Sequence, residues 1–458
     1  MDINRRHFTL LAAAFAFSGL AKCTNAREQN MSQIVKGYGD LIPDPDGLLD
    51  LPKGFSYEII SAFGETMDDG LKVPDAADGM GCIPLSDTSV ALIRNHELRV
   101  NKYEEGPQTE TVSKITKAFD FIEDDDLALP GGTSTLIYDL EQNKVTRQFL
   151  SLSGTIRNCA GGVTPWGSWL TCEEDVTKAG DGVTKDHGWV FEVPASSETL
   201  IDPVPLKDLG RFNHEATAVD PETGIVYMTE DRDDSLFYRF IPDTYGKLNE
   251  GGRLQALGFK DTSIPSDSRN SDTLVWKTGD WQDAIWIDLE DTHSPEDDLR
   301  NRGHAKGAVI FARGEGIHWG DDELYFCCTS GGEAGLGQIM RYKPSRDQGL
   351  ENKGASTGKI QLFLESTDPT HFNFGDNLTI ASNGHLFVCE DQYSFLPENH
   401  IRGVTNSGAI YDFARIRVDT EPAGACFSPD GSILFVNLYS PAKTLAIKGP
   451  WASVSEQA

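Results

Sequence analysis

Carboxylate side chains recur at matching places along this chain. They fall into two kinds of cluster, one before a turn and one at the end of the strand that follows it. In four repeats the two clusters lie 15 residues apart, as from Cys159 to Glu174 and from Asp376 to Asp391. Carboxylate oxygens are the ligands that calcium prefers, at about six to eight oxygens for each ion. The acidic residues at these positions are Glu97, Glu173, Glu174, Glu215, Glu230, Asp231, Glu315, Asp376, Glu390, Asp391 and Glu421.

Each acid in this set has two possible roles. It can bind a metal ion, with Asn95, Asn213 and Asn377 as neutral additional ligands, or it can cap a turn or pair with an arginine. Acids brought to one place repel one another unless cations neutralise them. For the set as a whole we therefore expect a cluster of metal ions.

Two further residues at these positions have a different chemistry. Cys159 lies in the glycine-rich segment N-C-A-G-G. A thiolate ligand there would select a softer or redox-active metal such as iron, and the alternative is a buried thiol. Arg313 lies two residues before Glu315, on the same side of an extended segment. A guanidinium beside bound cations is expected where an anion joins them, whereas the alternative is an ion pair with Glu315.

Six short apolar strands must position these side chains. Each follows a turn signal such as P-E-T-G or S-N-G, and most end in side chains that can bind a cation. A strand, a turn and a returning strand, repeated six times, predict an all-β fold: a six-bladed β-propeller with inserted loops, whose strand ends meet in one central funnel. The strands are expected over residues 90–97, 169–175, 226–232, 324–330, 386–392 and 434–440.

Residues 51–458 are predicted to form this single propeller domain, after a loose lead-in segment over 27–50. A strand over 51–60 can pair with 444–451 and close the ring with both ends of the domain. Polar insertions are expected at about 101–130 and 248–305, the second as a partly ordered excursion over the funnel or rim, with one short helix.

The first 26 residues have the pattern of an export signal. Arg5 and Arg6 are twin arginines in N-R-R-H-F-T-L, an apolar run follows, and the small-residue segment T-N-A ends at Ala26. This pattern indicates the twin-arginine route, which exports folded proteins. The alternatives are an ordinary secretory signal and a lipid anchor at Cys23. We expect the protein in the periplasm or secreted, with the twin-arginine machinery as a partner and no stable membrane span, because the apolar run is too short.

The formal net charge of the chain is −31, and removal of residues 1–26, which carry +2, would make it −33. This charge argues against nucleic acid and anionic membranes as partners, because phosphate contacts need clustered lysines and arginines. Seven cysteines remain after residue 26, scattered over strands, so most are expected to be buried thiols. The sequence has no H-E-x-x-H zinc motif. A hydrolase with this sequence is expected to use a metal-borne nucleophile.

Several segments together resemble the PhoX-type alkaline phosphatases, and the resemblance runs from about residue 51 to Trp451. They are R-N-H-E (94–97), N-C-A-G-G-V-T-P-W-G-S-W-L-T-C-E-E (158–174), G-R-F-N-H-E-A (210–216), G-I-V-Y-M-T-E-D (224–231), F-A-R-G-E-G-I-H-W (311–319), D-N-L (376–378), F-V-C-E-D (387–391) and E-P-A-G-A-C-F-S-P-D-G (421–431).

The resemblance implies an exported, metal-dependent alkaline phosphatase that hydrolyses small-molecule phosphate monoesters. It implies about three Ca2+ and about two Fe3+ around a bridging oxo group, with a metal-bound oxo or hydroxide as nucleophile. Arg313 would hold the substrate phosphate, and Cys159 would bind iron. The other implied metal ligands are Glu215 and Glu315, followed by Glu97, Glu174, Glu230, Asp376, Asn377 and Glu390. No motif assigns a second basic contact to phosphate; the candidates are Lys306, Lys443 and Lys448.

Two other functions fit the same residues. A calcium-dependent propeller hydrolase of diesters or lactones would need no iron and would tolerate Cys159→Ser. A non-catalytic binding propeller would use calcium only to stabilise the funnel. Turnover of a phosphate monoester, and its dependence on metal, separates the three functions.

Overall fold

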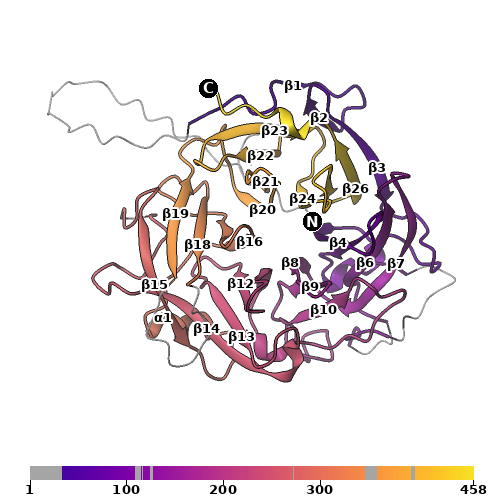
Figure 1. Cartoon of the computed structure of the whole chain (residues 1–458). Coiled ribbons are helices and arrows are strands. Elements are labelled where there is room, and N and C mark those ends of the chain that lie inside the picture. Colours follow the sequence, from indigo (N-terminus) through magenta and orange to yellow (C-terminus); the bar gives the residue numbers. More distant parts are fainter. Residues whose placement is uncertain are drawn as a thin grey trace, which may run out of the picture. The chain divides into compact units, whose positions relative to one another are not determined.

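The computed structural model describes residues 33–108, 115, 117–123, 127–271, 273–345, 358–392 and 398–457. The export signal expected over 1–26 lies outside these residues. Ser32–Ala458 forms one compact unit, and its described part is all-β with a propeller-like arrangement of strands (Figure 1). The described residues contain one short α-helix, α1 (Leu299–Ala305), and the 3-10 helices η1 (Val100–Glu105), η2 (Lys207–Leu209), η3 (Leu248–Glu250) and η4 (Trp451–Ser453).

The described strands form five antiparallel sheets. The first sheet contains β4 (Ala77–Pro84), β5 (Ser89–His96), β6 (Gly131–Asp139) and β7 (Lys144–Thr155), and the second contains β8 (Asn158–Val163), β9 (Ser168–Glu173) and β10 (Val190–Pro194). The largest sheet has the order β11 (His214–Val219), β12 (Val226–Glu230), β13 (Tyr238–Pro242), β14 (Gly252–Phe259), β15 (Trp281–Asp288), β19 (Lys359–Glu365), β18 (Gln338–Lys343), β17 (Leu324–Cys328), β16 (Gly314–Trp319).

Strands from both ends of the compact unit share the last two sheets. One has the order β1 (Leu41–Ile42), β2 (Leu49–Pro52), β23 (Ile410–Ile416), β22 (His400–Val404), β21 (Leu386–Glu390), β20 (Gly375–Ile380). The other has the order β24 (Pro422–Phe427), β25 (Ile433–Leu438), β26 (Lys443–Lys448), β3 (Ser56–Ala62).

The strands β4, β8, β11, β16, β20 and β24 follow one another in a closed cycle. Each packs against the next along the chain, and β24 packs against β4. These inner strands lie around the middle of Figure 1, and the returning strands β5, β9, β12, β17, β21 and β25 are their hydrogen-bonded neighbours. All six strands expected from the sequence are therefore present, and corresponding ends of the inner strands meet at one centre.

The all-β class and the propeller-like arrangement are confirmed. The hydrogen-bonded sheets do not separate cleanly into six, because β15 and β19 pair edge to edge over Trp281–Asp283 and join two groups of strands into one sheet of nine. Residues 252–259 and 281–288 of the expected polar excursion supply β14 and β15 of this sheet. Apolar side chains explain the difference, since Leu254, Ala256 and Leu257 of β14 are buried.

The predicted closure of the ring by both ends of the domain is confirmed with a shift in position. The segment expected as one strand over 51–60 is divided at Gly54, whose φ of +91° is left-handed. The part before Gly54 lies in β2 and pairs with β23, while β3 after it pairs with β26. The lead-in is also packed, because the ring of Tyr38 lies against Phe55 and Trp451.

Candidate metal centre

Every strand of the inner cycle carries a register irregularity near its start, directly after its first residue in five strands and after its second residue, Ala423, in β24. The irregularities lie between Ala77 and Met80, Asn158 and Gly161, His214 and Thr217, Gly314 and Ile317, Gly375 and Leu378, and Ala423 and Cys426. A β-bulge changes the direction in which a side chain points, and bulges are common beside active sites. The second residues of these strands are Asp78, Cys159, Glu215, Glu315, Asp376 and Ala423. Five of the six are of metal-ligand type.

Four of these residues, Asp78, Cys159, Glu315 and Asp376, line a cavity of about 550 Å³. Its described lining contains nine acidic residues and three arginines, so its charge is strongly negative. Acids at this density need cations close by to neutralise them. The charged lining residues are Asp78, Glu97, Arg99, Arg157, Glu174, Asp231, Arg313, Glu315, Asp376, Asp391, Asp419 and Glu421.

Three overlapping groups of ligand atoms form a continuous chain at this cavity. In each group one ligand atom from every residue lies within 4.8 Å of the others. Cys159 belongs to the first two groups and Glu215 to the last two, so the groups share members. They are Asp78, Glu97 and Cys159; Cys159, Glu174 and Glu215; and Glu215, Glu315 and Asp376.

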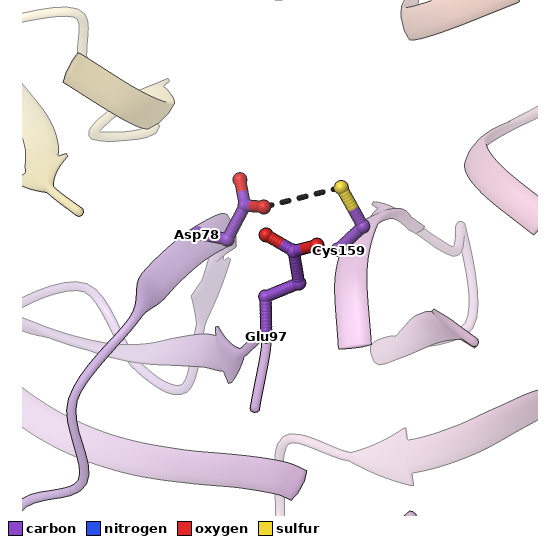
Figure 2. Close-up of side chains that lie close together, drawn as sticks. All are labelled: Asp78, Glu97 and Cys159. Atoms are coloured by element: carbon purple, nitrogen blue, oxygen red, sulfur yellow. Dashed lines mark hydrogen bonds between the residues drawn. The ribbon is translucent and has the colours of Figure 1, made fainter. Parts of the chain in front are cut away.

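Figure 2 shows the first group, in which the side chains of Asp78, Glu97 and Cys159 point toward one another. Cys159 Sγ donates a hydrogen bond to Asp78 Oδ2 at 3.1 Å. Burial, followed by the nearby carboxylates, raises the pKa of the Cys159 thiol well above its usual range. Cys159 becomes a thiolate only with a cation close to its sulfur.

Glu215 provides the strongest test of whether these residues fit metal ions. Its side chain is 0% exposed, and neither of its carboxylate oxygens has a hydrogen-bond partner in the described part of the chain. Asp78 Oδ1 is buried and unpartnered as well. Burial, and then the carboxylates of Asp376, Glu174 and Asp78, raise the pKa of Glu215 well above its usual range. Because a buried polar group without partners is costly, this arrangement fits bound cations.

Glu315 and Asp376 complete the third group, and burial and neighbouring carboxylates raise the pKa of each. Burial, followed by Asp231 and Glu215, raises the pKa of Glu315 well above its usual range. Burial and the Asp391 carboxylate raise the pKa of Asp376 to about 7. The structure therefore brings Cys159, Glu215, Glu315, Glu97, Glu174 and Asp376 together, as the sequence predicted.

The structure places Glu230 and Glu390 away from this cavity. Glu390 accepts hydrogen bonds from the backbone N–H groups of Asn373 and His400 and pairs with Arg402 at 2.8 Å. Glu230 accepts from Tyr238 Oη at 2.7 Å and from the Leu236 N–H. Each therefore ties its own strand end to neighbouring backbone.

Strand alternation explains this placement. Glu230 and Glu390 are the last residues of β12 and β21, and the residues that follow them, Asp231 and Asp391, line the cavity. Successive side chains of a strand point to opposite faces. The same alternation places Glu174 at the cavity, whereas Glu173 accepts hydrogen bonds from the N–H groups of Gly188 and Trp189.

Asn377 also lies outside the ligand groups. Its Oδ1 accepts a hydrogen bond from the Gly424 N–H at 2.6 Å, and its Nδ2 donates to Asp376. Asn377 lines a second cavity, of about 480 Å³, in place of the acidic one. It thus joins β20 to β24 immediately behind the candidate ligands.

Arg313 lies at the acidic cavity, held by two carboxylates. It donates to Asp231 through Nε at 2.7 Å and Nη2 at 2.9 Å, and Nη2 also lies 2.9 Å from Glu315 Oε1. Arg313 therefore forms the ion pair with Glu315 that the sequence offered as an alternative to anion binding. It also lines the cavity wall.

Sequence reasoning missed two further arginines at this cavity, Arg99 and Arg157. Lys306, Lys443 and Lys448, the lysines considered for a second phosphate contact, do not line the cavity, whereas Arg157 does. The spacing in the sequence could have identified Arg157. It lies two residues before Cys159, and Arg313 lies two residues before Glu315.

The remaining described cysteines are free thiols: Cys172, Cys327, Cys328, Cys389 and Cys426 are buried and Cys82 is half-buried, in line with the sequence prediction. The segment G-A-S-T-G (354–358) has the G-x-S-x-G form of a nucleophile elbow. An elbow leads from a strand into a helix. This segment is followed instead by strand β19, and its residues 354–357 lie outside the described part.

No helix in the described part of the chain is long and apolar enough to span a membrane.

The family model of the alkaline phosphatase PhoX matches residues 36–137 and 130–442. A comparison with curated proteins gives no match. Among solved structures, the chain is similar to Pseudomonas fluorescens PhoX in complex with vanadate, a transition state analogue, with a TM-score of 0.69, 18% identity and coverage of 92% of this chain and 98% of that chain. A gluconolactonase from Xanthomonas campestris gives a TM-score of 0.40 at 11% identity, over 90% and 98% of the two chains. The family match spans most of the sequence, and the chain belongs to the alkaline phosphatase PhoX family.

Proposed function

We propose that this protein is an exported, metal-dependent alkaline phosphatase that hydrolyses small-molecule phosphate monoesters. The observation that carries this proposal is the fully buried Glu215 carboxylate, which has no hydrogen-bond partner among the described residues and belongs to two of the three ligand groups. Membership of the PhoX family supports phosphatase activity. The arginine fork of Arg313 at the same cavity supports a phosphoryl group as the substrate moiety.

We further infer that the fold is a six-bladed propeller. Six inner strands in a closed cycle support this count, and each carries a register irregularity within its first two residues. The pairing of β15 with β19 then joins two neighbouring blades at their outer edges.

The three ligand groups are the proposed positions of the ions. Carboxylate oxygens suit Ca2+, and the Cys159 sulfur suits iron. The proposed numbers, about three calcium and about two ferric ions, are those that the resemblance to the PhoX-type phosphatases implies. When bound, such ions neutralise negative charge and lower the pKa of water. The proposed ligands are Asp78, Glu97, Cys159, Glu174, Glu215, Glu315 and Asp376.

Arg313 is proposed to bind and orient the phosphoryl group. Its two-point contact with Asp231 fixes the plane of the guanidinium, and Glu315 holds it from a second direction. A guanidinium whose plane is fixed in this way can donate charge-assisted hydrogen bonds to a phosphoryl group. Preorganised donors of this kind stabilise charge that develops in a transition state.

Two substitutions test these assignments. Glu315→Ala should remove bound metal and activity together, because it deletes a ligand. Arg313→Ala should keep the metal content, measured by elemental analysis, and lower kcat/KM for p-nitrophenyl phosphate by about 100-fold or more. Full activity in metal-loaded Arg313→Ala would contradict its assigned role.

Export by the twin-arginine route is proposed on the segment N-R-R-H-F-T-L and the apolar run after it. Replacement of Arg5 and Arg6 by lysine should leave the precursor in the cytoplasm of the producing cell. Cell fractionation measures this, and export of the double variant at the normal level would contradict the route.

A further inference from the structure

Arg157 and Arg313 occupy equivalent positions in two repeats of the fold. Arg157 directly precedes β8 and Arg313 directly precedes β16. Both have left-handed backbones, with φ of +47° and +51°. This conformation is unfavourable for a non-glycine residue. The repeat therefore places both arginines on the same strained turn, two residues before a candidate metal ligand.

The two guanidinium groups are also held in the same way. Arg157 Nη2 lies 2.7 Å from Glu97 Oε1 and 2.6 Å from Glu174 Oε2. Glu97 directly follows β5, in the repeat before Arg157. In the same way Asp231, which pairs with Arg313, directly follows β12, in the repeat before Arg313. In each case a strand-end acid of the preceding repeat fixes the guanidinium.

Both arginines face the acidic cavity and remain partly open to it. Their side chains are 17% and 23% exposed, and both line the cavity wall. Glu97 and Glu174, which hold Arg157, belong to the ligand groups themselves. Once cations neutralise those acids, a guanidinium beside them is repelled unless an anion lies between the positive charges.

We propose that Arg157 is a second phosphate-binding residue, which donates hydrogen bonds to the phosphoryl group together with Arg313. This inference rests on the proposed phosphatase function and supplies the second basic contact that the lysines do not provide. Two guanidinium groups from different repeats would fix the orientation of a tetrahedral group more closely than one group can.

Phosphate binding and metal content test this role separately. We would compare wild type, Arg157→Gln and Arg313→Gln, each loaded with metal, by calorimetric titration with inorganic phosphate and by elemental analysis. Both variants should bind phosphate about 10-fold to 100-fold more weakly, as expected for the loss of charge-assisted hydrogen bonds, with wild-type metal content. Arg341→Gln is the matched control, because Arg341 makes a two-point pair with Glu323 away from the cavity, and its phosphate affinity should be unchanged.

Arg157→Lys covers the case in which Arg157→Gln folds poorly or loses metal. Lysine keeps a positive charge beside Glu97 and Glu174 but lacks the fork, so metal content should be retained and phosphate binding weakened several-fold. Wild-type phosphate affinity in a metal-loaded Arg157 variant would overturn the inference and reduce Arg157 to an ion-pair partner. If wild type hydrolyses p-nitrophenyl phosphate in that case, the proposed function stands and only the role of Arg157 falls.

Discussion

At the scale of single residues, the candidate centre depends on carboxylates that the protein alone leaves unsatisfied. Glu215 is the extreme case, because the one S–H proton of Cys159 is donated to Asp78 and no other donor reaches the Glu215 oxygens. A side chain in this position destabilises the metal-free fold and stabilises the metal-bound one. Stability and metal affinity therefore oppose each other at Glu215.

Glu215→Gln should raise the stability of the metal-free protein and lower its affinity for metal. Removal of the buried charge should stabilise the metal-free protein by about 1 to 3 kcal/mol, while the gain in melting temperature on addition of calcium and iron should shrink. Thermal unfolding with and without chelator measures both effects. A lower melting temperature for the chelated variant than for chelated wild type would show that Glu215 is satisfied without metal.

Residue types and spacing identified most of the centre from the sequence, but not which face of each strand end points inward. The strand ends E-E-D, E-D and E-D offer adjacent acids, and a shift of one residue exchanges the faces. Asp231 and Asp391 line the cavity, whereas Glu230 and Glu390 bind backbone N–H groups. The distinction depends on where each bulge falls, which the sequence pattern does not show.

At the scale of elements, glycines behind the bulges allow the inner strands to approach one another. Gly424 on β24 is the clearest example, with a φ of +56° and a position against β4. A Cβ atom added there would lie 2.2 Å from the Asp78 carbonyl oxygen. The contact that closes the inner cycle therefore lies directly beside a candidate ligand.

Gly424→Ala should destabilise the fold by about 3 kcal/mol or more, because strain and a backbone clash add together. Gly431→Ala is the matched control in the next turn, where φ is +70° and the added Cβ would lie 3.4 Å from Ser382 Oγ. That control should lose only about 1 kcal/mol. Chemical unfolding measures both variants, and equal losses would contradict close packing at the β24–β4 contact.

A buried histidine ties β9 to two loops. His187 bonds through Nδ1 to Glu173 at 2.6 Å and through Nε2 to Asp120 at 3.1 Å. Burial alone would lower the pKa of His187, but Glu173 and Asp120 outweigh it and raise the pKa from 6.5 to about 9. The pKa of His187 is higher in the folded protein than in the unfolded chain. The stabilisation that its pairs with Glu173 and Asp120 give is therefore complete below about pH 6.5 and is lost as the pH rises through about 9.

His187→Gln should therefore destabilise the protein more at about pH 6 than at about pH 10, with a difference on the order of 3 kcal/mol. Urea unfolding of both proteins at the two pH values measures the difference. A loss that does not depend on pH would show that His187 is neutral in the folded protein.

At the scale of the whole molecule, the internal repeat made the fold predictable. Six apolar strands at regular spacing indicated a propeller-like ring, and pairing of β3 with β26 bore out its closure by both ends. The polar sequence around 248–305 concealed β14 and β15, because two strands within a largely polar segment give a weak periodic signal. Arg157 was missed although it lies two residues before Cys159, as Arg313 does before Glu315, because the sequence does not show that both arginines line one cavity.

The central claim is that bound metal ions make this cavity a phosphatase site. The most direct measurement is hydrolysis of p-nitrophenyl phosphate at alkaline pH by the metal-loaded protein, before and after treatment with a calcium chelator. We expect turnover that is lost on chelation and returns when calcium is added back. Turnover that survives removal of the metal, or no turnover by folded protein that retains its metal, would contradict the claim.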